Sequence, residues 1–177
     1  MSFKKLFLQN VLWEFQGIKK LGDRTMEQLS YDELHWKPSS ESNNIALIVK
    51  HLSGNMLSRW TDFLTSDGEK SWRNRDEEFE GLYDSKDELL AAWEKGWQVV
   101  FSTIESLTVN DLLETITIRG EAHTVLQAIN RQISHYSYHI GQIVYVGKQV
   151  KNEQFNSLSI PKGFSEQYLK EKLDENK

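Results

Sequence analysis

Apolar residues recur every three or four positions in four long segments, and this spacing constrains the fold more than any other feature. It predicts helices over about residues 2–26, 45–64, 86–104 and 125–150, each with its apolar side chains on one face. Four amphipathic helices of this length typically pack against one another around a shared core. The sequence therefore predicts an all-α four-helix bundle.

Local signals divide the rest of the chain. Ser30–Glu33 has the pattern of a capping box and predicts a short helical turn that Pro38 ends. The alternation in residues 115–118, followed by Arg119-Gly120, predicts a short β-hairpin before the last long helix. Expected caps of the three later long helices are Asn43 or Asn44, a capping box at Ser85–Glu88, and Thr124 with Gln127.

Two segments lie outside this pattern. We expect residues 1–150 to form the bundle, and residues 151–177 to form a C-terminal tail that packs on its surface. The polar connection over residues 65–84 is longer than compact bundles normally use. Trp72 and Phe79 are its expected anchors. Such a loop is either a solvated connection or a lid or partner-binding element.

Composition excludes several classes of protein. The chain has no Cys, which rules out disulfides, thiolate nucleophiles and Cys-ligated zinc. Its 21 basic and 26 acidic residues are interspersed, and no basic face stands out that would bind nucleic acid. No apolar run is long enough to cross a membrane, and no signal-peptide cleavage site follows the first residues. We therefore expect a cytoplasmic protein that binds neither nucleic acid nor membrane.

Without Cys, chemistry has to come from histidines, carboxylates, hydroxyls or a metal, and the histidines show the most informative spacing. His135 and His139 lie one helical turn apart and can bind one cation together. Tyr136 stands where a zinc protease of the H-E-x-x-H type would have its glutamate, which excludes that class. His51 is the third candidate ligand. Spacing alone leaves two alternatives, namely three ordinary, partly exposed histidines or a three-histidine site with positions open to water or substrate.

Two stretches of the sequence are similar to a known family. Residues 43–55, with His51 inside them, and the later H-x-x-x-H-x-G-Q-I run of residues 135–143 resemble the DinB/YfiT-like family. The order of elements, including the hairpin, also matches. One poorly characterised bacterial branch of that superfamily is similar to this chain in a further stretch, which comprises residues 58–70 and the following Arg73, Arg75 and Asp76.

The resemblance implies a homodimeric bundle that binds a divalent metal, with Zn²⁺ or Ni²⁺ as the first expectations, through a histidine triad of His51, His135 and His139. Some relatives act on small molecules with low-molecular-weight thiols, so the function implied is a metal-dependent S-transferase or hydrolase. The alternative is a non-catalytic, stress-related binding or dimerisation module whose metal site is structural or vestigial.

Three further residues are candidates for supporting roles. Gln142 lies on the helical face of the two histidines and either orients a ligand or is an ordinary surface amide. Asn55 and Arg59 extend the row that begins at His51 and can orient an anionic substrate. For Arg59 the alternative is an ion pair with Asp62 or with a loop carboxylate.

Assembly is suggested by the width of two apolar faces. The first and third long helices carry Leu8, Leu12, Trp13 and Trp93, more apolar surface than one seam needs. Together with the resemblance, this predicts a homodimer with twofold symmetry.

Overall fold

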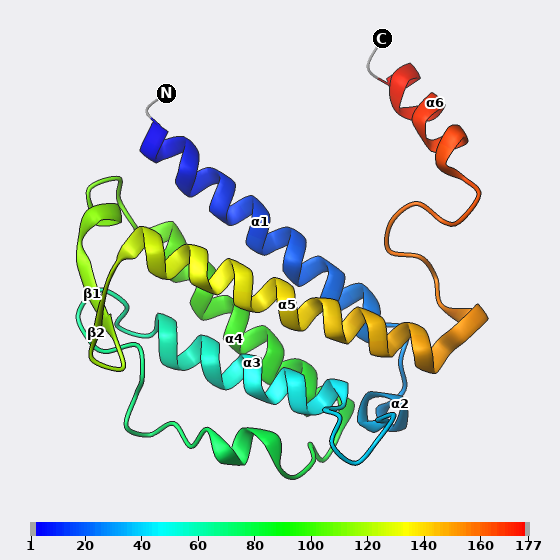
Figure 1. Cartoon of the computed structure of the whole chain (residues 1–177), viewed down its shortest axis with the longest axis horizontal. Helices are drawn as coiled ribbons and strands as arrows, with labels where there is room; N and C mark the ends of the chain where they lie inside the picture. The colour runs from blue at the N-terminus through cyan, green and yellow to red at the C-terminus, as the bar shows by residue number, and fades with distance from the viewer. Residues whose placement is uncertain (1–2, 176–177) are drawn as a thin grey trace.

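The computed structural model describes residues 3–175 and is mainly helical. Its four long helices lie side by side (Figure 1). The helix α1 contacts α4 and α5, and α3 contacts the same two, so that the four surround one core. The long helices are α1 (Phe3–Met26), α3 (Ile45–Trp60), α4 (Lys86–Ser106) and α5 (Val125–Lys151). Ser2, the expected first residue of α1, lies outside the described residues.

Short elements connect the long helices. The predicted hairpin is present, with β1 (Thr115–Ile118) paired antiparallel to β2 (Glu121–Thr124). Arg119 and Gly120 form its two-residue turn with φ of 57° and 76°, the positive values that match the twist of paired strands. The other short helices are α2 (Tyr31–His35), η1 (Asp76–Phe79), η2 (Asp111–Leu113), η3 (Asn152–Gln154) and α6 (Ser165–Glu175).

The helix starts follow the predicted caps. Both capping boxes that begin at Ser30 and Thr124 are complete, and the side chain of Asn44 accepts a hydrogen bond from the backbone of Leu47. The box at Ser85 is only half formed, because the Glu88 carboxylate accepts from the backbone N–H of Asp84 instead. These caps fix the residues at which the helices begin.

The predicted end of α3 near Leu64 is wrong. The helix stops at Trp60, and Asp62 has a φ of 50° in the turn that follows. Phe63 is nevertheless buried, and its ring lies 4.8 Å from that of Trp60. Phe63 is buried although it belongs to a turn. Its position matches the helical spacing of apolar residues, and the sequence pattern therefore placed the end of the helix too late.

Aromatic side chains fill the centre of the core. Phe15 meets Trp60 and Trp97 edge to face at 5.8 and 6.1 Å between ring centroids. The hydroxyl of Tyr136 accepts a hydrogen bond from Trp60 Nε1 at 2.9 Å and donates to Asn55 Oδ1 at 3.2 Å. With Tyr136 fully buried, the rotation of α5 about its axis is fixed, and the flank beside Tyr136 faces α3.

Residues 61–85 follow the body of the protein closely. Lys50 Nζ donates to the Glu80 carbonyl at 2.7 Å, and the Tyr31 hydroxyl to the Tyr83 carbonyl at 2.5 Å. Trp72, an expected anchor, is 59% exposed, and this prediction is wrong. A charged residue of the segment, Glu78, is buried instead, because polar partners are available to it.

The C-terminal segment touches the body at few points. Arg24 donates to the carbonyls of Ser157 and Leu158, and Gln28 exchanges hydrogen bonds with Asn156. No residue of α6 is buried, and this helix projects away from the four long helices (Figure 1). Within residues 3–175, no helix combines the length and apolar content needed to cross a bilayer.

Candidate metal centre

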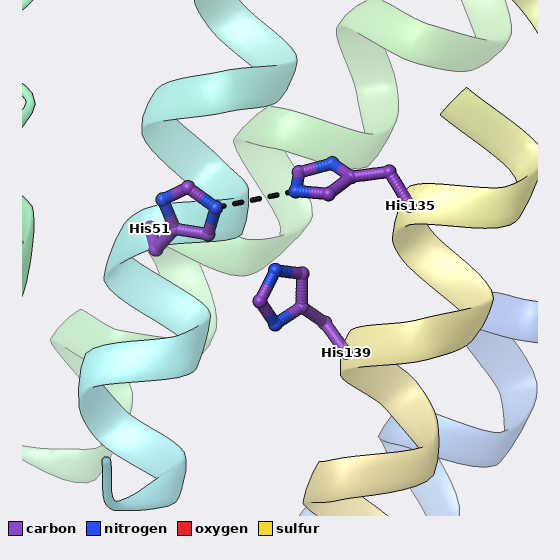
Figure 2. A group of neighbouring side chains, drawn as sticks. All are labelled: His51, His135 and His139. Carbon is purple, nitrogen blue, oxygen red and sulfur yellow. Dashed lines mark hydrogen bonds between the residues drawn. The ribbon is translucent and has the colours of Figure 1, made fainter. Parts of the chain in front are cut away.

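Three histidines from two helices converge at one point. His51 on α3 and His135 and His139 on α5 each offer one ring nitrogen, and these three nitrogens lie within 4.8 Å of one another. The three rings face one another across the gap between the helices (Figure 2). His51 is 4% exposed, whereas the other two are half-buried. The structure brings together the three histidines that the sequence singled out. Only His51 is buried, whereas His135 and His139 remain partly exposed, as the alternative of ordinary histidines also expects.

Hydrogen bonds fix which nitrogen of two rings carries the proton. His51 Nδ1 lies 3.0 Å from Glu78 Oε2, and a carboxylate can only accept, so Nδ1 donates. His139 Nδ1 lies 2.8 Å from the carboxamide oxygen of Gln142, which also accepts. In the neutral rings the Nε2 atoms of His51 and His139 therefore carry free lone pairs. Carboxylate or amide partners of this kind are typical of histidines that ligate metals.

The spacing of His51 and His135 fits a shared cation. Their Nε2 atoms are 3.3 Å apart. Two ligands held tetrahedrally at about 2.1 Å from a zinc ion lie about 3.4 Å from each other. Because His51 Nε2 carries a lone pair when its Nδ1 donates to Glu78, Nε2–H of His135 is the donor in this contact, and a shared cation would take the place of that proton. The third nitrogen, within 4.8 Å, needs a shift on the order of 1 Å to complete the set.

Burial favours the neutral form of the two histidines of α5. It lowers the pKa of His135 to about 3, helped by the neighbouring His139 and His51, and it also lowers the pKa of His139. A metal binds the unprotonated imidazole nitrogen, so both rings are in the ligating form at physiological pH.

Glu78 orients His51 and is itself held by Arg73. Arg73 donates from Nε to Glu78 Oε1 at 2.7 Å and from Nη2 to Oε2 at 2.8 Å, a bidentate pair. Burial raises the pKa of Glu78, but the bonds from Arg73 and His51 outweigh it, and the pKa stays below its ordinary value. Gly54 makes room for this carboxylate, because a Cβ there would lie 2.2 Å from Glu78 Oε1. Phe79 covers the other side of His51, with stacked rings 5.0 Å apart.

A cavity of about 220 Å³ opens beside the histidines. Its wall contains His51 and His135, the amides Asn55 and Gln132, and five arginines, namely Arg59, Arg73, Arg75, Arg119 and Arg131. The whole chain has only six arginines. Basic and acidic residues are interspersed along the sequence, but five arginines gather around this cavity and make it strongly cationic. This cavity was not predicted from the sequence, in which no basic face stands out.

The predicted supporting residues all lie at this site. Gln142 accepts a hydrogen bond from His139 Nδ1 and so orients this ring, which matches the first of its two alternatives, orienting a ligand, rather than an ordinary surface amide. Asn55 lines the cavity and accepts from Tyr136. Arg59 pairs with a loop carboxylate, Glu69, at 3.2 Å, and also donates to the Gly68 carbonyl. This pairing was the second interpretation of Arg59, with Glu69 rather than Asp62 as the partner.

Several residues of the site, including Arg75 and Arg119 of the cavity wall, were not predicted as such from the sequence. Arg131 and Gln132 lie one turn before His135 on α5, and helical spacing could have indicated them. Glu78 and Arg73 come from residues 61–85, where no periodicity exists to place a side chain. The unusual length and charge of that segment were the only signals.

Taken together, the fold and the site define a helical protein with a partly buried three-histidine cluster beside a cationic cavity. The sequence profile of a family described as "Protein of unknown function (DUF1572)" matches residues 2–164, and the chain belongs to this family. No curated protein shows a significant match. The chain is similar to a crystal structure described as the conserved protein of a locus from Enterococcus faecalis, with a TM-score of 0.63 and 16% identity over 85% of this chain and 98% of that one. At this identity the similarity concerns the fold alone.

Proposed function

We propose that the protein is a divalent-metal-binding protein of the DinB-like four-helix-bundle type, with His51, His135 and His139 as ligands. The observation that carries the proposal is the tautomer pattern. Glu78 and Gln142 accept hydrogen bonds from the Nδ1–H groups of His51 and His139, so that the lone pairs of these two rings are on their Nε2 atoms, and the Nε2 of His51 lies 3.3 Å from that of His135. An all-nitrogen ligand set favours Zn²⁺ or Ni²⁺ over Mg²⁺ and Ca²⁺, which prefer oxygen.

We further propose that the site is catalytic, as a thiol-dependent transferase or a hydrolase. A bound ion of this kind supplies Lewis acidity, which lowers the pKa of a coordinated water or thiol. Glu78 and Gln142 orient two of the rings through their Nδ1–H groups. Phe79 stacks on His51, and the buried ring of Tyr136 lies 5.6 Å from that of His135. Structural zinc sites are closed by four protein ligands, whereas three histidines leave a position open.

The alternative is a binding module whose metal is structural or vestigial. The cavity distinguishes the two hypotheses, because two of the three histidines form part of its wall. A small molecule in the cavity would reach the metal position directly. This arrangement favours a small-molecule reaction over a purely structural ion.

The test is metal analysis of protein purified without an affinity tag. We expect about one divalent ion per chain, and none in the His135→Ala variant. His123→Ala serves as the matched control, because His123 is in the hairpin and outside the cluster. Metal content that is equal in both variants, or absent from the wild type after reconstitution with Zn²⁺ and Ni²⁺, would contradict the proposal.

We also propose that the protein is a homodimer that associates through α1. Trp13 is 67% exposed and Leu6 is 51% exposed on this helix, while Leu8 and Leu12 are partly buried. Trp93, expected to contribute, is fully buried in the core of its own chain instead. Light scattering should give twice the 20.7 kDa chain mass, and the Trp13→Ser variant should shift toward the monomer. A wild type that is monomeric at micromolar concentration contradicts the proposal.

A further inference from the structure

Arginine is distributed very unevenly in this chain. Five of the six arginines line the cavity beside the histidines, whereas none of the 14 lysines within residues 3–175 does. The guanidinium group is planar and presents paired donors that match the two oxygens of a carboxylate or phosphate, which the ammonium group of lysine cannot do. A requirement for positive charge alone would be met by either residue type. The selection of arginine points to recognition of an oxyanion.

The carboxylates that contact these arginines do not neutralise them. Glu69 pairs with Arg59, Arg73 and Arg119, and Glu78 pairs with Arg73. These two carboxylates pair with the guanidinium groups, and a third, that of Asp67, accepts from the backbone N–H of Arg119. Five guanidinium groups against three carboxylates leave an excess of two positive charges around the cavity. The side chains of Arg75 and Arg131 make no hydrogen bond or ion pair with any residue in 3–175.

Polar atoms in the cavity wall also lack partners. Arg59 is 4% exposed, and its Nε–H is buried without a hydrogen bond within the described part of the chain. Gln132 is 3% exposed, and its carboxamide oxygen is likewise unpaired there, but this oxygen is an acceptor and needs a donor rather than the oxygen of an anion. A buried donor without a partner costs about 1–3 kcal/mol of stability, so the Nε–H of Arg59 needs an acceptor, which an anion or a water in the cavity supplies.

From these observations we propose that the cavity binds a small oxyanion, the carboxylate or phosphate group of the protein's substrate. Arg75 and Arg131 are its principal contacts, and Arg59 and Asn55 donate from the buried wall. The volume of about 220 Å³ lies below the roughly 300–1,000 Å³ of pockets for drug-sized ligands, which indicates a small metabolite rather than a polymer. The anion site rests on the arginines alone. Only the placement of the substrate's reacting end, beside His51 and His135, rests on the proposed metal centre.

Titration calorimetry on the metal-free protein tests this proposal. The probes are inorganic phosphate and succinate, with neutral succinamide as the reference, in chloride buffer at constant ionic strength. We expect saturable binding of at least one of the two anions and none of succinamide. Tighter phosphate binding would assign a phosphoryl group to the natural ligand, and tighter succinate binding a carboxylate.

Variants separate this site from general electrostatics. Arg75→Gln and Arg131→Gln remove exposed side chains, so both should fold, and each should weaken anion binding about tenfold, the loss expected when one charge-assisted contact disappears. Lys95→Gln removes the same charge from an exposed position on α4 outside the cavity and should leave binding unchanged. Absence of saturable binding, or an equal loss in the Lys95 variant, overturns the proposal.

Metal content of the same variants keeps the two proposals apart. Neither Arg75 nor Arg131 supplies a ligand nitrogen or a hydrogen bond to the three histidines in residues 3–175, and both variants should retain the metal of the wild type. Lost anion binding with retained metal supports the oxyanion site. A wild type that binds metal but no anion overturns this inference and leaves the metal centre standing, while the reverse result overturns only the metal centre.

Discussion

Two polar segments outside the four long helices differ sharply in how they relate to the body of the protein. Residues 61–85 bring Glu78 and Arg73 into a buried ion pair next to His51. Residues 152–175 touch α1 mainly through backbone groups, and their helix α6 is exposed along its whole length. Both segments are rich in charge. A charged segment is therefore structural where its charges find buried partners, and peripheral where they do not.

Removing Glu78 should have the largest effect. In Glu78→Ala the Arg73 guanidinium, whose side chain is 2% exposed, keeps its charge but loses its bidentate partner. Breaking a buried pair in this way costs about 3–5 kcal/mol of the free energy of unfolding, which urea denaturation measures. Glu77→Ala, at the exposed neighbouring position, should change it by less than about 0.5 kcal/mol. If Glu78→Ala lowers the free energy of unfolding as little as Glu77→Ala does, the charges of the segment 61–85 are as peripheral to the fold as those of the C-terminal tail.

Crowding the same carboxylate should have the next largest effect. Gly54→Ala places a Cβ 2.2 Å from Glu78 Oε1, so that the ion pair must move, at a cost of about 1–3 kcal/mol. Gly141→Ala is the matched control, because its Cβ would meet nothing within 4 Å. It should stabilise α5 by about 0.5–1 kcal/mol. Thermal melting of both variants measures the difference, and a stabilised Gly54→Ala variant would show that the approach of Glu78 is not tight.

Asp67 gives the segment 61–85 a pH-dependent attachment to the hairpin. Its carboxylate accepts backbone hydrogen bonds from Glu69, Arg119 and Gly120 at 2.7–2.8 Å. Burial raises the pKa of Asp67, but these bonds prevail and hold it well below the usual 3.8. Because the folded protein binds this proton more weakly than the unfolded chain, the stabilisation is complete above about pH 5 and is lost as the pH falls through 3.8 and below.

The Asp67→Asn variant should therefore be less stable than the wild type by about 1–2 kcal/mol at pH 7. The difference should shrink at about pH 3, where the stabilisation by the wild-type carboxylate is partly lost. Urea denaturation at both pH values measures this change. A difference independent of pH would mean that the charge of Asp67 contributes nothing beyond its shape.

Removal of the tail should have the smallest effect. Deleting residues 161–177 takes away the exposed α6 and leaves the contacts of Arg24 with Ser157 and Leu158 intact. We expect a change of less than about 0.5 kcal/mol in the free energy of unfolding, and unchanged metal content. A loss above about 1 kcal/mol would show that the tail packs on the body in solution more than its exposure indicates.

Much of this molecule is determined locally. The helix starts at Ser30, Asn44 and Thr124, the hairpin turn at Arg119-Gly120, and the histidine pair of α5 depend on neighbours at most four residues away in the sequence. Capping, helical periodicity and turn chemistry act over such short distances, and a single sequence contains all the information they require. For the same reason, helical spacing by itself places His135 and His139 on one face of α5.

The rotation of α3 against α5 and the path of residues 61–85 were decided only in three dimensions. Packing of Tyr136 against Trp60 brings Nε2 of His51 to 3.3 Å from Nε2 of His135. These two histidines are 84 positions apart in the sequence. Glu78 and the five arginines of the cavity come from α3, the segment 61–85, the hairpin and α5. Long-range ion pairs have no sequence period. They exist because a buried charge must find a partner, and only the completed core determines which charges are buried.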